Sequence, residues 1–366
     1  MFTKSASEKL AESPTTQSLD SYLISFFAAL CLFLSAVEYA IPKPLPFLRL
    51  GLANLPILLA IKKMPGKNVL LLVVFKILGQ ALLSGTLFSY IFLFSAAGSL
   101  ASGIMMLLVY KATCLFEKKM SGKKLISNIG LSLAGALANN GAQLLCARFI
   151  MFGENTRYIA PILIITGTIT GLCLGIFAYL FEEKSKWFKN LYTVEREQPV
   201  IKNSNSERKI EYSNVIWFVL SMANMLCFLF IKDVRLLWLA VLIFFIFTEI
   251  RRKGKVKILP SILIVITVTF FALLSPYGKV LFTIGSWRIT KDALISGLHR
   301  SGILVGMVFL SQCAITSKMQ LHGWAGNFLK ETFFVFEKLG EKRISFKPGK
   351  IIISIDGRLC EIYGKA

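Results

Sequence analysis

Residues 42–56 read Pro-Lys-Pro-Leu-Pro-Phe-Leu-Arg-Leu-Gly-Leu-Ala-Asn-Leu-Pro and separate two long apolar runs. Proline lacks a backbone N–H and clashes with the preceding turn, so one regular helix cannot cross this stretch. Irregular backbone at membrane depth is tolerated only where protein buries it or water reaches it. Arg49 and Asn54 lie on this broken, otherwise apolar segment, which we interpret as half of a small-molecule site. The alternative is an interfacial loop whose arginine reaches the membrane surface.

The composition indicates a polytopic membrane protein. Hydrophobic residues make up 55% of the chain, charged residues only 17%, and the mean hydropathy is +0.65, which is far more apolar than a soluble domain. The net charge of +22 lies in short loops between apolar runs, which favours membrane orientation over nucleic-acid binding. The cysteines are scattered, and neither histidine has a cysteine or carboxylate at ligand spacing. We therefore expect no disulfide framework, metal site or cofactor.

The apolar runs predict an all-α protein with about ten membrane segments in two bundles. A cytoplasmic tail at 1–20 precedes the first bundle at 21–182, for which about six segments are expected. The polar stretch at 183–213 is interpreted as a cytoplasmic linker. The second bundle is expected over 214–316, and residues 317–366 form a cytoplasmic C-terminal tail.

Lysine and arginine predict the orientation. If the N-terminus is inside, the basic loops at 62–67 and 111–124 and the stretch after residue 181 all face the cytoplasm, as the positive-inside rule requires. We therefore expect a multi-pass protein of the cytoplasmic membrane with both ends in the cytoplasm.

The last apolar run of the first bundle carries a stripe of glycines. Gly167, Gly171 and Gly175 fall four residues apart within 159–181, which predicts the close approach of a neighbouring backbone.

Two elements are expected in the C-terminal tail. Residues 324–339 carry apolar side chains close to helical spacing and predict an amphipathic helix at the inner membrane surface. Residues 351–355 are mostly apolar, Asp356-Gly357 is a turn signal, and a second short run follows at 358–363. This pattern predicts a short β-hairpin at the C-terminus.

Polar side chains inside the apolar runs form the candidate solute site. Lys76 and Gln80 are four residues apart on one helical face, and Asn140 and Gln143 are three apart on another. Because no water satisfies such groups inside a span, they must face the bundle interior or a cavity. Cations and amides together suit an anionic or strongly polar ligand, although any single amide could merely hold helices together. The predicted substrate-binding residues are Glu38, Arg49, Asn54, Lys76, Gln80, Asn140 and Gln143.

The familiar catalytic motifs are missing from the sequence. It contains no GxxxxGK[ST] phosphate loop, no paired acidic clusters of the kind that bind magnesium diphosphate, and no evident Ser/His/Asp or Cys/His arrangement. A catalytic role for the chain itself is therefore not predicted.

Four motifs in the first bundle carry a family resemblance. They are Pro46-Phe-Leu-Arg-Leu-Gly-Leu-Ala-Asn54, Phe75-Lys-Ile-Leu-Gly-Gln-Ala-Leu-Leu-Ser-Gly-Thr86, Ser95-Ala-Ala-Gly-Ser-Leu100 and Ser132-Leu-Ala-Gly-Ala-Leu-Ala-Asn-Asn-Gly-Ala-Gln143. Over residues 22–181 the chain resembles the Gx transporter family, often labelled heptaprenyl diphosphate synthase component I. Asn139 and Lys76 stand where that family often has His and Arg. The family is similar to the S components of energy-coupling-factor transporters, six-helix membrane proteins that capture a vitamin or similar small molecule.

The second bundle more weakly resembles the T component of the same transporters. The resemblance lies in Gly285-Ser-Trp-Arg-Ile-Thr-Lys-Asp-Ala-Leu-Ile-Ser-Gly-Leu298 and Arg300, which are similar to the segment before that family's coupling helices. It implies import of a small polar or anionic solute, with energy from separate cytoplasmic ATPase subunits and with membrane lipid around the chain. Arg300 and the helix at 324–343 are then expected to couple the two.

Two other functions remain open. One is a membrane subunit associated with polyprenyl (heptaprenyl) diphosphate synthesis, with catalysis elsewhere. The other is a structural membrane anchor for a partner complex.

Overall fold

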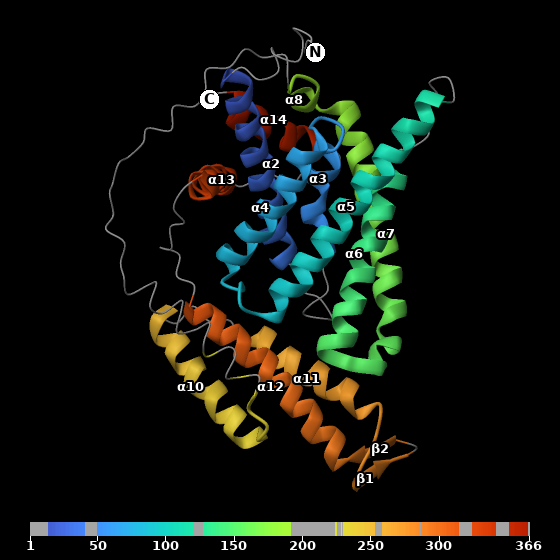
Figure 1. Cartoon of the computed structure of the whole chain (residues 1–366), viewed down its shortest axis with the longest axis vertical. Coiled ribbons are helices and arrows are strands. Elements are labelled where there is room, and N and C mark those ends of the chain that lie inside the picture. Colours follow the sequence, from blue (N-terminus) through green and yellow to red (C-terminus); the bar gives the residue numbers. More distant parts are fainter. Residues whose placement is uncertain are drawn as a thin grey trace, which may run out of the picture.

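The computed structural model describes residues 14–40, 50–119, 127–191, 224, 228, 230–252, 258–285, 287–314, 324–341 and 351–364. This part of the chain is helical apart from one two-stranded sheet. Figure 1 shows two blocks of helices along the longest axis. We refer to residues 14–189 as the N-terminal block and to residues 234–314 as the C-terminal block; the latter lies beyond one end of the former.

The N-terminal block is a bundle of long helices with one short helix inside it. Its α-helices are α2 (Pro14–Ala40), α3 (Leu55–Ala60), α4 (Gly66–Ser84), α5 (Tyr90–Lys119), α6 (Asn128–Cys146), α7 (Ala160–Lys184) and α8 (Lys186–Lys189). Two 3-10 turns, η1 (Leu52–Asn54) and η3 (Gly153–Tyr158), and one π-helical turn, η2 (Ala147–Phe152), join them.

The backbone break predicted from the prolines is present where the structure describes it. Gly51 has a φ of +86°, a left-handed conformation that glycine adopts without a steric penalty, and the chain then turns through η1 into α3. Pro56 lies in the first turn of α3, where a missing N–H costs nothing. All six residues of α3 are buried, so this half-helix is enclosed by the bundle. Residues 41–49, including Arg49, lie outside the described residues.

Glycines allow α6 and α7 to pack closely, as their spacing predicted. Gly167, Gly171 and Gly175 are all buried on α7. A Cβ placed on Gly175 would lie only 2.6 Å from the Cα of Ile129 on α6. The predicted close approach is therefore confirmed.

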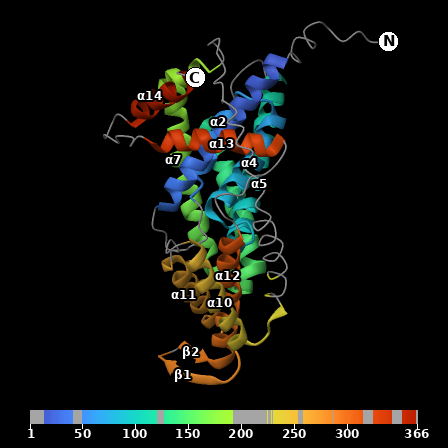
Figure 2. The ribbon, with the colours of Figure 1, turned by 90° about the vertical axis from the view of Figure 1, so that its left-hand side faces the viewer.

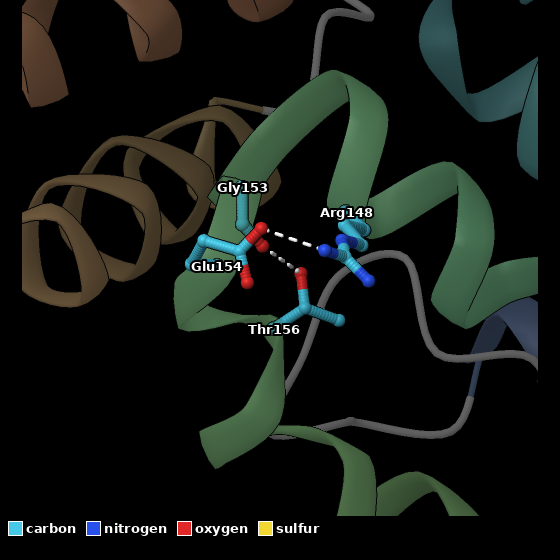
Figure 3. Close-up of polar contacts among 4 residues, drawn as sticks. All are labelled: Arg148, Gly153, Glu154 and Thr156. Atoms are coloured by element: carbon cyan, nitrogen blue, oxygen red, sulfur yellow. Dashed lines mark hydrogen bonds and ion pairs between the residues drawn. The ribbon is translucent and has the colours of Figure 1, made fainter.

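The turn between α6 and α7 is held by local polar contacts (Figure 3). Arg148 donates to the Glu154 carboxylate at 2.6 Å, and the Thr156 hydroxyl donates to the Gly153 carbonyl at 2.8 Å. Both charged side chains are largely exposed, so the ion pair contributes only about 0–1 kcal/mol. The turn therefore owes its shape mainly to backbone geometry and burial of its apolar residues.

The C-terminal block contains α10 (Val234–Arg252), α11 (Leu259–Leu273) and α12 (Lys291–Ala314), and α12 packs against both of the others. Between α11 and α12 lies an antiparallel hairpin of β1 (Val280–Ile284) and β2 (Trp287–Thr290). Gly285, with a φ of +60°, lies in its turn.

The two blocks meet at the turn between α4 and α5 and at η3. The Ser311 hydroxyl of α12 donates to the Gly85 carbonyl at 2.9 Å and accepts from the Phe88 N–H at 3.0 Å. The Asn155 amide donates to the Phe271 carbonyl of α11 at 2.8 Å. These turns of the N-terminal block are thus covered by the C-terminal block.

The predicted amphipathic helix is present as α13 (Trp324–Glu341), which lies across α2 and α4 (Figure 2); its place at the inner membrane surface stays a prediction. The Phe328 ring stacks on the Phe75 ring with 3.9 Å between centroids, and Glu331 accepts a 3.0 Å hydrogen bond from Ser25. The apolar face of α13 is therefore buried against the N-terminal block.

The predicted C-terminal hairpin is wrong, because residues 351–364 form a helix, α14 (Ile351–Gly364). Its apolar residues at 352, 355, 359 and 362 recur at helical spacing and pack into the core of the N-terminal block. Asp356, read as a turn residue, accepts hydrogen bonds from the Ser185 hydroxyl and from the N–H groups of Lys186 and Trp187 at the start of α8. Its carboxylate therefore caps another helix rather than forming a turn.

The described residues include five helical stretches long and apolar enough to cross a membrane. They are Ser21–Glu38, Gly66–Ser84, Tyr90–Glu117, Asn128–Lys184 and Lys291–Cys313, and the fourth contains both α6 and α7. An all-α, membrane-type protein is therefore confirmed. The count of about ten segments, the orientation and the domain boundaries stay predictions.

The α6–α7 packing gives a direct test of the fold. Gly175→Ala is expected to lower the stability by about 1–3 kcal/mol, because its Cβ meets backbone that must shift. Gly141→Ala, on α6 with open space around it, should be neutral or stabilising by about 0.5–1 kcal/mol. Thermal unfolding of both variants in lipid nanodiscs measures the difference, and equal melting temperatures would contradict the packing.

Candidate functional site

The candidate site is built around the buried ammonium group of Lys76. This side chain on α4 is only 3% exposed. Its Nζ donates to Asn54 Oδ1 at 2.5 Å and to Ser99 Oγ at 3.0 Å. The Asn54 amide in turn donates to Ser102 Oγ at 3.3 Å. Since a buried charge costs several kcal/mol without such partners, the broken segment and α5 supply what α4 needs to bury a cation.

A carboxylate and an amide lie around the same space. Glu38 lies near the end of α2 and is 2% exposed. Its carboxylate accepts a 2.7 Å hydrogen bond from the Leu50 N–H, just before η1. Gln80, one turn along α4 from Lys76, accepts a 3.1 Å hydrogen bond from the Ser95 hydroxyl. Opposite charges and an amide are thereby gathered inside the bundle.

Two small adjoining cavities lie among these groups. The lysine cavity is lined by Glu38, Gly51, Ala53, Asn54, Lys76, Gln80, Ser95, Ser99 and Asn139. The asparagine cavity shares Gly51, Asn54 and Asn139 with it and continues to Ser102, Ser132, Asn140 and Thr170. In each cavity the volume open to the centre of a water molecule is about 20 Å³, so each has room for about one water. The site is therefore closed, and a larger solute requires these elements to move apart.

Asn140 has a structural contact in addition to its place at the asparagine cavity. Its Nδ2 donates to the Leu163 carbonyl at 2.6 Å, and its Oδ1 accepts from Asn139 at 3.3 Å. A Cβ on Gly167 would lie 1.6 Å from this amide, so Asn140 occupies the space that the glycine leaves. The amide therefore holds α6 and α7 together.

Gln143 is a different case. It is fully buried, and neither its Oε1 nor its Nε2 has a hydrogen-bond partner among the described residues. It lines neither cavity but lies near Gly98, where an added Cβ would be 3.3 Å from its Nε2. An unsatisfied buried amide of this kind costs about 1–3 kcal/mol.

The predicted residues are therefore only partly brought together. Glu38, Asn54, Lys76 and Gln80 share the lysine cavity, Asn140 lines its neighbour, and Gln143 lies apart. Arg49 is outside the described residues. Their role in substrate contact stays a prediction.

Arg300, predicted to couple the chain to its ATPase subunits, lies away from the lysine and asparagine cavities. It is an exposed residue of α12 whose guanidinium donates to the Met151 carbonyl of η2 at 3.3 Å. It therefore joins the two blocks at a point separate from the contacts of α13.

The sequence interpretation missed the serines of α5 that line the site. Ser95, Ser99 and Ser102 are spaced four and three residues apart, which places them on one helical face. Their hydroxyls bond Gln80, Lys76 and Asn54 respectively. Only Ser95 and Ser99 fall within the third family motif, and serine spacing alone does not distinguish a site from ordinary helix packing.

The donor set suits recognition by hydrogen bonds and charge. Among the described residues no group of three His, Cys, Asp or Glu side chains is placed to hold a metal ion.

Comparison with known proteins gives two family matches. Residues 27–181 match the family described as heptaprenyl diphosphate synthase component I, which confirms the resemblance found in the four motifs. Residues 213–317 match a domain of unknown function (DUF8519). No curated protein and no solved structure matched the chain.

The two amides on α6 should respond differently to replacement. Gln143→Leu is expected to leave the melting temperature of the solute-free protein unchanged or raise it, because it removes an unsatisfied buried amide. Asn140→Leu is expected to lose about 1–3 kcal/mol, because it removes the bond to Leu163 and crowds Gly167. Equal losses in thermal unfolding experiments would mean that Gln143 has a partner in the folded protein.

Proposed function

We propose that this chain is the membrane component of an energy-coupling-factor-type transporter that binds and imports a small polar or anionic solute. The observation that carries the proposal is the buried Lys76 ammonium at the lysine cavity, with Asn54 and Ser99 as acceptors. Ionisable groups inside membrane bundles are expensive and typically mark substrate pathways. A cation surrounded by amides and hydroxyls suits a carboxylate, a phosphate or a comparably polar group.

The family match supports the same reading. It covers nearly all of the N-terminal block, and the Gx family resembles proteins that capture small molecules in the membrane. Energy would come from separate cytoplasmic ATPase subunits. On this proposal the N-terminal block captures the solute, and the C-terminal block with α13 transmits the movement that opens the site.

The contacts of α13 suit this transmitting role. Phe75, on which Phe328 stacks, is the immediate neighbour of Lys76 on α4. Ser25, which bonds Glu331, lies on the same helix as Glu38. A displacement of α13 would therefore act on both helices that carry charge into the lysine cavity.

The second candidate is a membrane subunit associated with polyprenyl diphosphate synthesis. The observation that favours it is the description of the matching family. In this case catalysis would belong to a partner, and the buried cation would attract the diphosphate group of a prenyl substrate.

Solute binding through Lys76 can be tested by a matched pair of substitutions on one helix. A panel of vitamins, small anions and isoprenoid diphosphates would first be screened for thermal stabilisation of the protein in nanodiscs. For any hit, Lys76→Gln should weaken binding by about ten- to a hundredfold, since a charged hydrogen bond contributes about 1.5–3 kcal/mol. Lys67→Gln, an exposed position on α4, should leave the affinity unchanged. Equal affinities for both variants would remove Lys76 from the site.

The two candidate functions predict different partners. Gentle solubilisation of the tagged chain from its native membrane should recover a pair of ATPase subunits if it is a transporter component. Recovery of a prenyl synthase subunit in stoichiometric amount, without ATPases, would favour the second candidate. Mass spectrometry of the purified complex identifies the partner in either case.

A further inference from the structure

A third, larger cavity lies between the two blocks. We refer to it as the interblock cavity: α2, α4 and α5 line one side, and α11, α12 and α13 line the other. Its volume, measured as the space open to the centre of a water molecule, is about 370 Å³, compared with about 20 Å³ for the lysine cavity. This is within the range of small-molecule sites.

The wall of the interblock cavity combines apolar and polar side chains. Leu32, Ile264 and Phe336 are among the apolar ones. The polar ones come from both blocks and are Ser35, Gln80, Ser84, Ser261 and Gln312. The polar side chains give this cavity the hydrogen-bonding groups that buried water or a polar solute needs.

Gln80 separates the interblock cavity from the candidate site. It lines both the interblock cavity and the lysine cavity, and it is 8% exposed. Lys76, Gln80 and Ser84 are spaced four apart on α4, so they form one stripe from the buried ammonium to the larger cavity. The Ser95 hydroxyl donates a 3.1 Å hydrogen bond to the side-chain Oε1 of Gln80. Along this stripe a single side chain separates the two cavities.

We propose that the interblock cavity is an aqueous vestibule through which the lysine cavity is filled or emptied, and that the Gln80 side chain is its gate. The occupants are water and the polar or anionic solute of the proposed function. The inference rests on that function only for the identity of what passes. In this arrangement the joint between the blocks is part of the solute route.

Thiol accessibility tests the vestibule without any knowledge of the solute. Ser84→Cys reports on the interblock cavity and Ser99→Cys on the lysine cavity, each in a background whose seven native cysteines are replaced by alanine. Each protein in nanodiscs is treated with an anionic, membrane-impermeant methanethiosulfonate, which the Lys76 ammonium does not repel, and, separately, with N-ethylmaleimide. Ser84→Cys should react with both reagents, and Ser99→Cys should resist the anionic one. Size-exclusion profiles identify variants that do not fold.

The gate is tested in the Ser99→Cys protein. Gln80→Ala should raise the rate of modification by the anionic reagent about tenfold or more, because a buried thiol reacts in proportion to its access to water. Gln80→Leu fills the same space and should leave the thiol protected. Leu83→Ala, which enlarges the interblock cavity without touching the lysine cavity, should also leave it protected.

Two results would overturn the inference. Reaction of Ser84→Cys with N-ethylmaleimide alone would mean that the cavity is filled by lipid. Equal acceleration of Ser99→Cys by Gln80→Ala and Leu83→Ala would mean general loosening rather than a gate. An unchanged solute affinity in Lys76→Gln would refute the proposed function and leave these accessibility results to decide the vestibule separately.

Discussion

The N-terminal block depends on hydrogen bonding of one buried ammonium. Lys76 can remain charged inside an apolar bundle only if oxygen acceptors reach it, and Asn54 and Ser99 provide them. A continuous helix could not easily bring Asn54 there; the turn at Gly51 and the short buried helix that follows do so. The small residues of α5 likewise bring its hydroxyls close to α4. The turn at Gly51, the short helix α3 and Ser99 of α5 therefore together surround this cation with oxygen.

Much of the fold could be predicted because apolar runs long enough to cross a membrane have few alternatives to helix. The errors at their ends have one physical cause. Hydropathy marks the part of a helix that avoids water, but a helix continues beyond it. α2 begins at Pro14, within the predicted tail at 1–20, and α5 continues to Lys119, within the predicted loop at 111–124. The glycine stripe of α7 was predictable for a related reason, since few structures other than a close helix contact require such spacing.

Prediction failed where tertiary contacts decided the outcome. The run at 351–355 is too short for its periodicity to separate strand from helix, and the adjacent Asp356-Gly357 favoured a hairpin. In the folded chain Asp356 caps α8, a contact between residues about 170 positions apart that no local pattern encodes. The same holds for the candidate site. Its charged and amide residues could be predicted because such groups are costly inside a membrane, whereas serine is common in membrane helices and gives no comparable signal.

The position of α13 connects the closed site to the rest of the chain. Glu38 and Lys76 carry opposite charges on two different helices, α2 and α4, and α13 contacts both. Asp356 of α14 caps α8, so a second helix of the C-terminal segment is also held against the N-terminal block. Because packed interiors shift between discrete arrangements rather than deform smoothly, release of this helix would free α2 and α4 together. Since Glu38 and Lys76 both line the lysine cavity, such a movement of α2 and α4 would also widen that cavity.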